Sequence, residues 1–426
     1  MNRSLLAAGL GAFACAALAS EVPLTLAEAQ RLAVERSSRV AAQDASITAS
    51  REMATAAGQR PDPVLKAGID NVPVTGADRF SLGNDFMTMR RVGLMQELTS
   101  SDKLKLRSDR FELEAEKSAA ERNATIADIQ RDSATAWLER FYAGRASALV
   151  AEQVAAARLE TQAAEGAFRG GRVNEASVFA ARLALSSLED RNAEARRREA
   201  AARISLARWI GADAQRPLAQ APALDTTPVH GTHIATAVGS HPMIAVLAKQ
   251  ERIAQTEARL AQAARHPDWS VEVSYANRGG GFSDMVSIGV SVPLPWDRGN
   301  RQDREVAAKL ALADEARASR EDAERSHAAE IEAMLVEWDD DRARLRRFAA
   351  ETIPLAHERA EASLTEYRGG RSSLADVLAA RRSELDVRVQ ALQLELEAAR
   401  LWAQLNFFVP DESVLPKRLV TVKEKP

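Results

Sequence analysis

Three histidines are the first residues in this sequence whose type and spacing suggest metal binding. His230 and His233 form an H-x-x-H pair in a proline-flanked connector, and His241 follows shortly afterwards. A zinc site needs three or four ligands that converge on one point. A connector loop does not hold that many ligands in place, so the pattern favours ordinary polar histidines over a metal site.

Three methionines and one acidic run offer the other candidate chemistry. Met87, Met89 and Met95 alternate along one predicted strand face and carry soft thioether donors, but an apolar strand face explains the same spacing and is favoured. The run Asp339–Asp341 after Trp338 is interpreted as a solvated helix face. The sequence has no Ser/His/Asp array, phosphate-binding loop or dinucleotide fingerprint. We therefore expect neither enzyme activity nor a bound metal or cofactor.

Composition disfavours a nucleic-acid binder and favours long helices. The 426 residues carry a formal net charge of −3, whereas a protein that binds phosphate backbones has a marked basic excess. Aromatic residues make up 5% and charged residues 27% of the chain. This mixture is typical of closely packed helices rather than of a compact aromatic core.

Residues 1–19 have the organisation of an export signal. A positive start, MNRS, precedes the apolar stretch LLAAGLGAFACAALA, which ends in an Ala-Leu-Ala cleavage site. Cys15 is either the site of a lipid anchor or an apolar residue that is removed with the signal. We favour removal, because Ala12 stands where a lipoprotein signal usually has leucine. No later stretch reaches the ~18 consecutive apolar residues of a membrane helix, and the mature chain would lack cysteine and thus disulfides.

The pentapeptides FRGGR (168–172) and YRGGR (367–371) indicate an internal duplication. VNEASVFAAR follows the first and SSLADVLAAR the second, with the same Ala/Val/Arg pattern and no gap. Upstream, QRPDP matches RHPDW. Because repeats decide the fold, we divide the chain into a signal, two structural repeats and a C-terminal tail. Their boundaries are 1–19, 20–220, 221–409 and 410–426.

Each repeat is predicted to contain a long helical hairpin. Runs without glycine or proline, such as 101–142 and 371–409, are longer than ordinary globular helices. Leu378, Leu385 and Leu392 recur every seven residues, as one row of a heptad seam does.

Glycine pairs mark the predicted hairpin tips. Glycine readily adopts the left-handed conformation that ends a helix, so the turns are placed at 168–174 and 367–373. Pro354 predicts a local kink in the second hairpin, and no proline matches it in the first.

Two segments of each repeat alternate apolar and polar residues, as membrane barrel strands do. They are 269–276 and 286–294 in the second repeat and, less cleanly because of an arginine pair, 64–70 and 86–98 in the first. A sheet of four strands cannot close, and open edges are not tolerated in lipid. Strands of other copies must cover these edges, and three copies would supply a closed barrel of about twelve strands.

With these features the chain resembles the TolC-type outer-membrane efflux channels over essentially its whole mature length. The resemblance rests on the duplication, on the PDP and PDW junctions, on the strand ending VSVPLPWDRGNR and on ETIPLAHERAEASLTEYRGGRSSLADVLAARRSELDVRVQALQLELEAARLWAQL. It implies a mainly α chain with a small β-barrel portion. Three chains would form a twelve-stranded barrel in the outer membrane of a Gram-negative bacterium and a helical tunnel in the periplasm.

The resemblance also implies a function and partners. The trimer would be a passive duct in outer-membrane lipid, without a cofactor, that receives cargo from an inner-membrane transporter of the resistance-nodulation-division type through a periplasmic adaptor. The segments IDNVPVTGADRFSLGNDFMTMRRVGLMQE and PLPWDRGNRQ are more similar to the heavy-metal-export branch of the family than to the drug-export branch. Heavy-metal cations are therefore a candidate cargo, and the adaptor and the pump stay unidentified.

In this family the hairpin tips receive the adaptor. The matching residues here are Arg169, Gly170, Gly171 and Arg172 in the first copy and Arg368, Gly369, Gly370 and Arg371 in the second.

The resemblance assigns the entrance gate to Tyr367, as the latch tyrosine, and to Asp376, as the acidic ring. Three copies of Asp376 at a narrow entrance would favour cations, while a solvated aspartate on a helix face is the alternative. Ala379 and Ser177 stand where further acidic or polar partners are expected, so the gate should differ in detail from that of the family.

A second class of function is a periplasmic coiled-coil adaptor or structural protein without a barrel. Such proteins also carry export signals and helical hairpins. An adaptor would have lipoyl-like and other β-domains on either side of a single hairpin, whereas this chain alternates strand pairs and hairpins twice.

Overall fold

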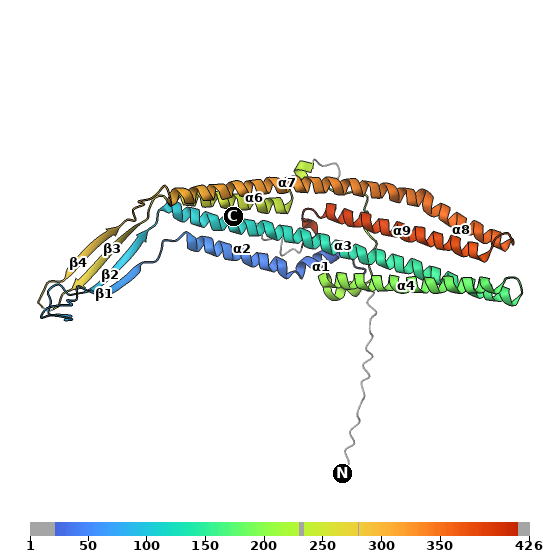
Figure 1. Cartoon of the computed structure of the whole chain (residues 1–426), viewed down its shortest axis with the longest axis horizontal. Helices are drawn as coiled ribbons and strands as arrows, with labels where there is room; N and C mark the ends of the chain where they lie inside the picture. Colours follow the sequence, from blue (N-terminus) through green and yellow to red (C-terminus); the bar gives the residue numbers. More distant parts are fainter. Residues whose placement is uncertain (1–21, 230–233, 280, 416–426) are drawn as a thin grey trace, which may run out of the picture.

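The computed structural model describes residues 22–229, 234–279 and 281–415. The molecule is long and curved, with a β-sheet at one end and the tips of two helical hairpins at the other (Figure 1). The expected export signal, including Cys15, and the pair His230 and His233 lie outside the described residues.

The two repeats have the same order of elements: a short helix, a longer helix, two strands and a helical hairpin. This confirms the predicted mainly α, internally duplicated fold class. The first repeat contains α1 (Leu26–Glu35), α2 (Ser38–Ala57), β1 (Val64–Asp70), β2 (Met89–Leu98), α3 (Ser101–Arg169) and α4 (Glu175–Ile210). The second contains α5 (Ile234–Gly239), α6 (Pro242–Ala263), β3 (Trp269–Asn277), β4 (Met285–Ser291), α7 (Gln302–Arg347), α8 (Ile353–Arg368) and α9 (Leu374–Asn406). Short 3-10 turns cover Gly211–Gln215 and Glu412–Val414.

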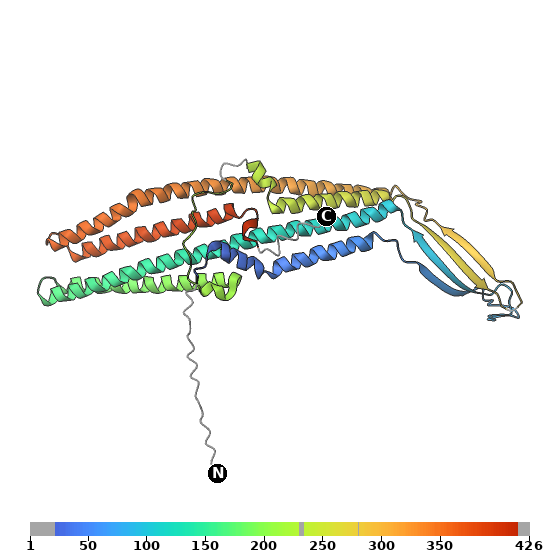
Figure 2. The ribbon, with the colours of Figure 1, turned by 180° about the vertical axis from the view of Figure 1, so that it is seen from behind.

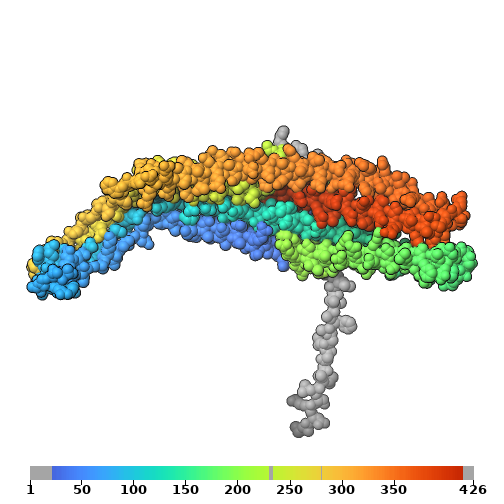
Figure 3. Space-filling view, viewed as in Figure 1, coloured from blue at the N-terminus to red at the C-terminus, as the bar shows by residue number. Residues whose placement is uncertain are grey.

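Each long helix is covered by two shorter helices that lie end to end along it. The 69 residues of α3 extend for about 100 Å at 1.5 Å per residue. Helices α2 and α4 follow each other along α3, while α6 and α9 do the same along α7 and α8 (Figures 2 and 3). Nowhere in the described ranges is a helix both long and apolar enough to cross a membrane.

The second long helix is interrupted where the sequence predicts a kink. Helix α7 ends at Arg347, a π-helical turn covers Phe348–Thr352, and α8 continues in a changed direction (Figure 1). Pro354 has no amide hydrogen to bond to the carbonyl one turn earlier, so the helix widens locally. Helix α3 has no proline in its matching region and stays continuous.

The described strands form one antiparallel sheet in the order β1-β2-β3-β4, so both repeats contribute to it. Strands β1 and β4 are its edges, and among the residues that the structure describes neither has a partner on its outer side within the protomer. The last strand ends at Ser291 rather than at Leu294 as predicted, because Pro293 and Pro295 cannot donate to a strand ladder.

The two faces of the sheet differ sharply in chemistry. Cross-strand pairing aligns Leu65, Leu94, Val273 and Ile288 on one face, and these side chains are between 48% and 75% exposed. A row of exposed aliphatic side chains this regular is what a lipid-facing strand surface requires.

The opposite face carries charges that pair across the strands. Lys66 Nζ lies 2.6 Å from Glu272 Oε2, and Arg91 Nε lies 2.9 Å from Asp70 Oδ2. This arrangement explains the arginine pair that interrupts the apolar–polar alternation of the sequence. Arg91 points to the charged face. Its neighbour Arg90 lies on the apolar face, near the loop end of the sheet.

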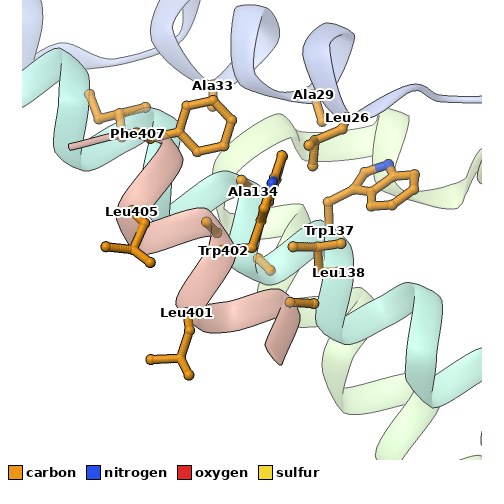
Figure 4. Packing of buried hydrophobic residues seen from close by; sticks show 14 of the residues in the cluster. Leu26, Ala29, Ala33, Ala134, Trp137, Leu138, Leu401, Trp402, Leu405 and Phe407 are labelled. Atoms are coloured by element: carbon orange, nitrogen blue, oxygen red, sulfur yellow. The ribbon is translucent and has the colours of Figure 1, made fainter. Parts of the chain in front are cut away.

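The main apolar core lies midway along the helices, where both repeats meet. Trp137 and Trp338, which the duplication matches, are both fully buried there, and Trp137 Nε1 donates to the carbonyl of Leu24 at 3.1 Å. Figure 4 shows Trp137 and Trp402 in this cluster. The interpretation of Asp339–Asp341 as a solvated face is wrong for Asp341, which is buried beside Arg344 and whose pKa is raised by that burial.

We expect Gly93→Ala to destabilise the sheet. A Cβ at Gly93 would lie 2.8 Å from Ser274 Cβ on β3, and overpacking of this kind costs about 1–3 kcal/mol. The free energy of unfolding of the detergent-solubilised protein measures the effect. The control is Gly289→Ala on β4, where a Cβ meets nothing within 4 Å; equal stability of the two variants would contradict the expected close contact.

Candidate functional site

The two hairpin tips have the same backbone geometry. At the first, Gly170 caps α3, Gly171 has φ +68°, and the Arg172 amide donates to the Ala167 carbonyl at 2.9 Å. The second repeats this arrangement: Gly369 caps α8, Gly370 has φ +71°, and the Arg371 amide donates to the Glu366 carbonyl at 2.9 Å. The positive φ explains the second glycine of each pair, because a side chain there is sterically disfavoured.

The tip residues assigned from the resemblance therefore lie together at one end of the molecule. All eight are exposed: Arg169, Gly170, Gly171, Arg172, Arg368, Gly369, Gly370 and Arg371. Each tip presents a tight turn flanked by two arginines. Their role in adaptor docking stays a prediction.

The helix that follows each tip begins with a side-chain cap. Asn174 Oδ1 accepts from the Ser177 amide at 3.0 Å at the start of α4. At the start of α9, Ser373 and Asp376 form a capping box, in which Asp376 Oδ2 accepts from the Ser373 amide at 3.0 Å. Hydrogen bonds from Ser373 hold the pKa of Asp376 below its usual value. Asp376 is thus a charged, exposed group that also stabilises the helix, and its ring role stays a prediction.

A small apolar cluster joins the helices of both hairpins near the tips. Ala164 of α3, Ala181 of α4 and Leu374 of α9 are buried there. Tyr367 of α8 and Leu378 of α9 pack against them. The tyrosine that the resemblance assigns to the latch is therefore in contact with a cluster that spans the two hairpins.

Sequence reasoning missed the ion pairs that connect the hairpins. Arg381 of α9 lies 3.4 Å from Glu160 of α3 and 3.4 Å from Glu361 of its own hairpin. Burial raises the pKa of Glu160, and the Arg381 charge opposes this shift. A second connection joins Arg191 Nη1 of α4 to Asp386 Oδ1 of α9 at 2.7 Å.

The duplication contained the signal for one of these pairs. Arg182 and Arg381 occupy the same place in the two repeats. Arg182 pairs with Glu165 within the first hairpin at 2.7 Å, whereas Arg381 also reaches across to the other hairpin. A duplicated arginine was visible in the sequence, but which acid faces it depends on how the helices pack.

The candidate metal ligands do not come together. Met89 and Met95 lie on the charged face of β2, about 20 Å apart along the strand, and Met87 lies outside β2. His241 packs against His327, with ring centroids 4.4 Å apart. Within the described residues no group of three or more His, Cys, Asp or Glu side chains could hold a metal ion.

Residues 234–409 match the family model described as outer membrane efflux protein. The match runs from the start of α5 to just beyond α9. This stretch, which covers most of the second repeat, is thus similar in sequence to outer membrane efflux proteins. A search of curated proteins finds no sequence match.

Solved outer-membrane proteins share the fold of this chain over at least 90% of its length. The CmeC outer membrane channel of Campylobacter jejuni aligns with a TM-score of 0.75 at 14% identity, over 93% of this chain and 88% of that chain. VceC of Vibrio cholerae gives 0.74 at 19% identity, over 90% and 95%, and the open-state MtrE channel of Neisseria gonorrhoeae gives 0.70 at 19%, over 90% and 88%. The fold expected from the sequence resemblance is confirmed.

We expect Gly370→Ala to destabilise the second tip by about 1 kcal/mol, the cost of a side chain in the left-handed region. Gly369→Ala is the control, because Gly369 has φ −80° and a Cβ there would meet only ordinary contacts. The flanking arginines make tryptic cleavage at the tip a direct measurement. Cleavage of Gly370→Ala should be about fivefold faster than that of Gly369→Ala; equal rates would contradict a conformational requirement at Gly370.

Proposed function

We propose that three copies of this chain form an outer-membrane efflux channel. The observation that carries this proposal is the sheet: its two outer edges lack partners within the described part of the protomer, one face is apolar, and the other face bears paired charges. Lipid does not tolerate open edges. Edge-to-edge pairing of β1 with β4 of the next copy, repeated around a three-fold axis, would close a barrel of about twelve strands with the charges inside.

The helical part is proposed to form the periplasmic tunnel. It extends away from the sheet for the length of α3, so the hairpin tips lie at the far end from the membrane (Figure 1). There the exposed arginines of the tips would meet the periplasmic adaptor, which connects the channel to an inner-membrane transporter of the resistance-nodulation-division type. The fold favours this function over the adaptor alternative, because all strands of the described residues belong to a single sheet.

Opening of the entrance is proposed to separate the two hairpins at their tips. The pairs Arg381–Glu160 and Arg191–Asp386 would then break. Partly exposed ion pairs contribute about 0.2–1 kcal/mol each, so contacts with a partner protein are strong enough to replace them. A duct that opens in this way needs no reaction of its own, because the transporter supplies the energy.

The cargo is proposed from the charge at the entrance. Three Asp376 carboxylates around a narrow entrance would favour cations over anions, which agrees with the heavy-metal resemblance of the sequence. The methionines do not add a binding site, since Met89 and Met95 are too far apart to share one ion. Heavy-metal cations stay the proposed cargo class, and tolerance of a deletion strain to copper, zinc and drugs tests it.

The function is tested on protein extracted from outer membranes in detergent. We expect a mass of three chains and stable ion conductance in a planar bilayer. A soluble, non-conducting monomer would overturn the proposal.

We expect Arg381→Gln to raise the conductance of the closed channel or the fraction of time it is open. The substitution removes a contact between the hairpins, and a loss of about 1 kcal/mol corresponds to a roughly fivefold shift between closed and open states. The matched control is Arg182→Gln, which removes a pair confined to the first hairpin. Single-channel recording measures both variants, and equal effects would rule out a specific role for the connection to Glu160.

A further inference from the structure

The two repeats use different side chains at the same structural position. In the first repeat, Ser37 separates the short helix α1 from α2, and its hydroxyl accepts from the Val40 amide at 3.3 Å. In the second, His241 lies between α5 and α6, and its Nδ1 accepts from the Met243 amide at 3.2 Å. Serine is a common helix N-cap, whereas histidine is not among the preferred ones. The cap of the second repeat can therefore titrate and that of the first cannot.

The histidine cap works only with a neutral ring. Nδ1 must keep its lone pair to accept from Met243, so the proton of the neutral imidazole lies on Nε2. Protonation places a hydrogen on Nδ1 and removes the acceptor. The preceding residue of the helix, Pro242, has no amide hydrogen, so the Met243 amide is the first backbone donor of α6 and depends directly on this cap.

Packing around His241 opposes protonation. The ring is partly buried, 4.4 Å from the His327 ring of α7 and 4.3 Å from the Phe408 ring, which follows α9. Burial lowers the pKa of His241, and the neighbouring His327 lowers it further, to about 4. His327 Nδ1 in turn lies 3.0 Å from Glu330 Oε2.

Charged groups from the two packed helices modify this pKa in both directions. On α3, Asp128 raises the pKa of His241 and Arg131 lowers it. On α7, Glu330 raises it. Burial and the second imidazole outweigh the two carboxylates, since the net shift is downward.

We propose that His241 is an acid-sensitive cap, which loosens the junction of α5 and α6 when the surroundings of the channel acidify, while the Ser37 junction stays closed. The junction contacts α7, and α7 leads from strand β4 into the second hairpin. Loosening it would release the base of one hairpin and leave the other held. This device lies far from the tips and does not depend on the proposed cargo or adaptor.

The pH range of the effect follows from the difference in the pKa of His241 between the closed and the opened junction. In the opened junction the imidazole has its ordinary pKa of 6.5, and in the closed one about 4. The contribution of the neutral cap to the stability of the closed junction is complete above pH 6.5 and is lost as pH falls from 6.5 towards 4. The open population rises by up to about tenfold per pH unit in this window, which gives about a twentyfold rise between pH 7 and pH 5.

Hydrogen exchange of the full chain in detergent or lipid tests this proposal. After correction for intrinsic rates, the protection of the first turn of α6 at Met243 should fall about twentyfold between pH 7 and pH 5. The first turn of α2, at Val40, is an internal control in the same molecule and should change by less than about threefold. An equal fall in both turns would show general acid loosening and overturn the proposal.

Two variants separate the titration from the cap itself. His241→Asn and His241→Ser both keep a good N-cap acceptor and remove the titrating ring. In each variant the first turn of α6 should be protected from hydrogen exchange at pH 7, and this protection should not fall at pH 5. If either variant folds and retains the fall of about twentyfold in protection, another group titrates and His241 is not the sensor.

Discussion

The proposed assembly of this protein depends on one physical requirement: the backbone hydrogen-bonding groups at the two open edges of its sheet need partners. Among the described residues, strands β1 and β4 each leave one row of backbone donors and acceptors without partners inside the protomer. In lipid every such group must be bonded, so in the proposed channel copies of the same chain complete the ladder. A threefold arrangement of the helices would follow from that closure, because each sheet is continuous with its own hairpins. Entrance, tunnel and barrel would then be one assembly rather than separable parts.

The internal duplication explains the common framework of the two repeats, and small sequence differences explain where their structures differ. Both repeats have the same glycine turns and the same buried tryptophan, Trp137 or Trp338. Their backbones differ where Pro354 forces a π-helical turn into the second long helix and the first stays regular. Their charges differ at the duplicated arginine, because only the copy at Arg381 reaches across to the other hairpin. The two hairpins thus share one architecture and differ in backbone geometry and in charged contacts.

Local patterns predicted the elements well, and their failures have local causes. The alternation of apolar and polar residues predicted where the strands lie. It predicted too long a β4, because the alternation continues beyond Ser291 into a segment whose two prolines cannot donate to the strand ladder. Composition made Asp341 look solvated, although its turn of α7 faces the central core and buries it. The resemblance placed Asp376 at an acidic ring, and it does lie exposed at a tip, but its carboxylate is also part of a capping box with Ser373.

The sequence by itself determined the repeats, the extent of the long helices and the tip turns. Each of these depends on periodicity or on residues such as Gly171 and Gly370, whose backbone requirements act over a few positions. Only the tertiary structure decided that all strands join one sheet, that Arg381 faces Glu160, and that His241 packs against His327. These contacts join positions far apart in the chain, and their geometry is set by how long helices pack along one another. No local pattern contains that information.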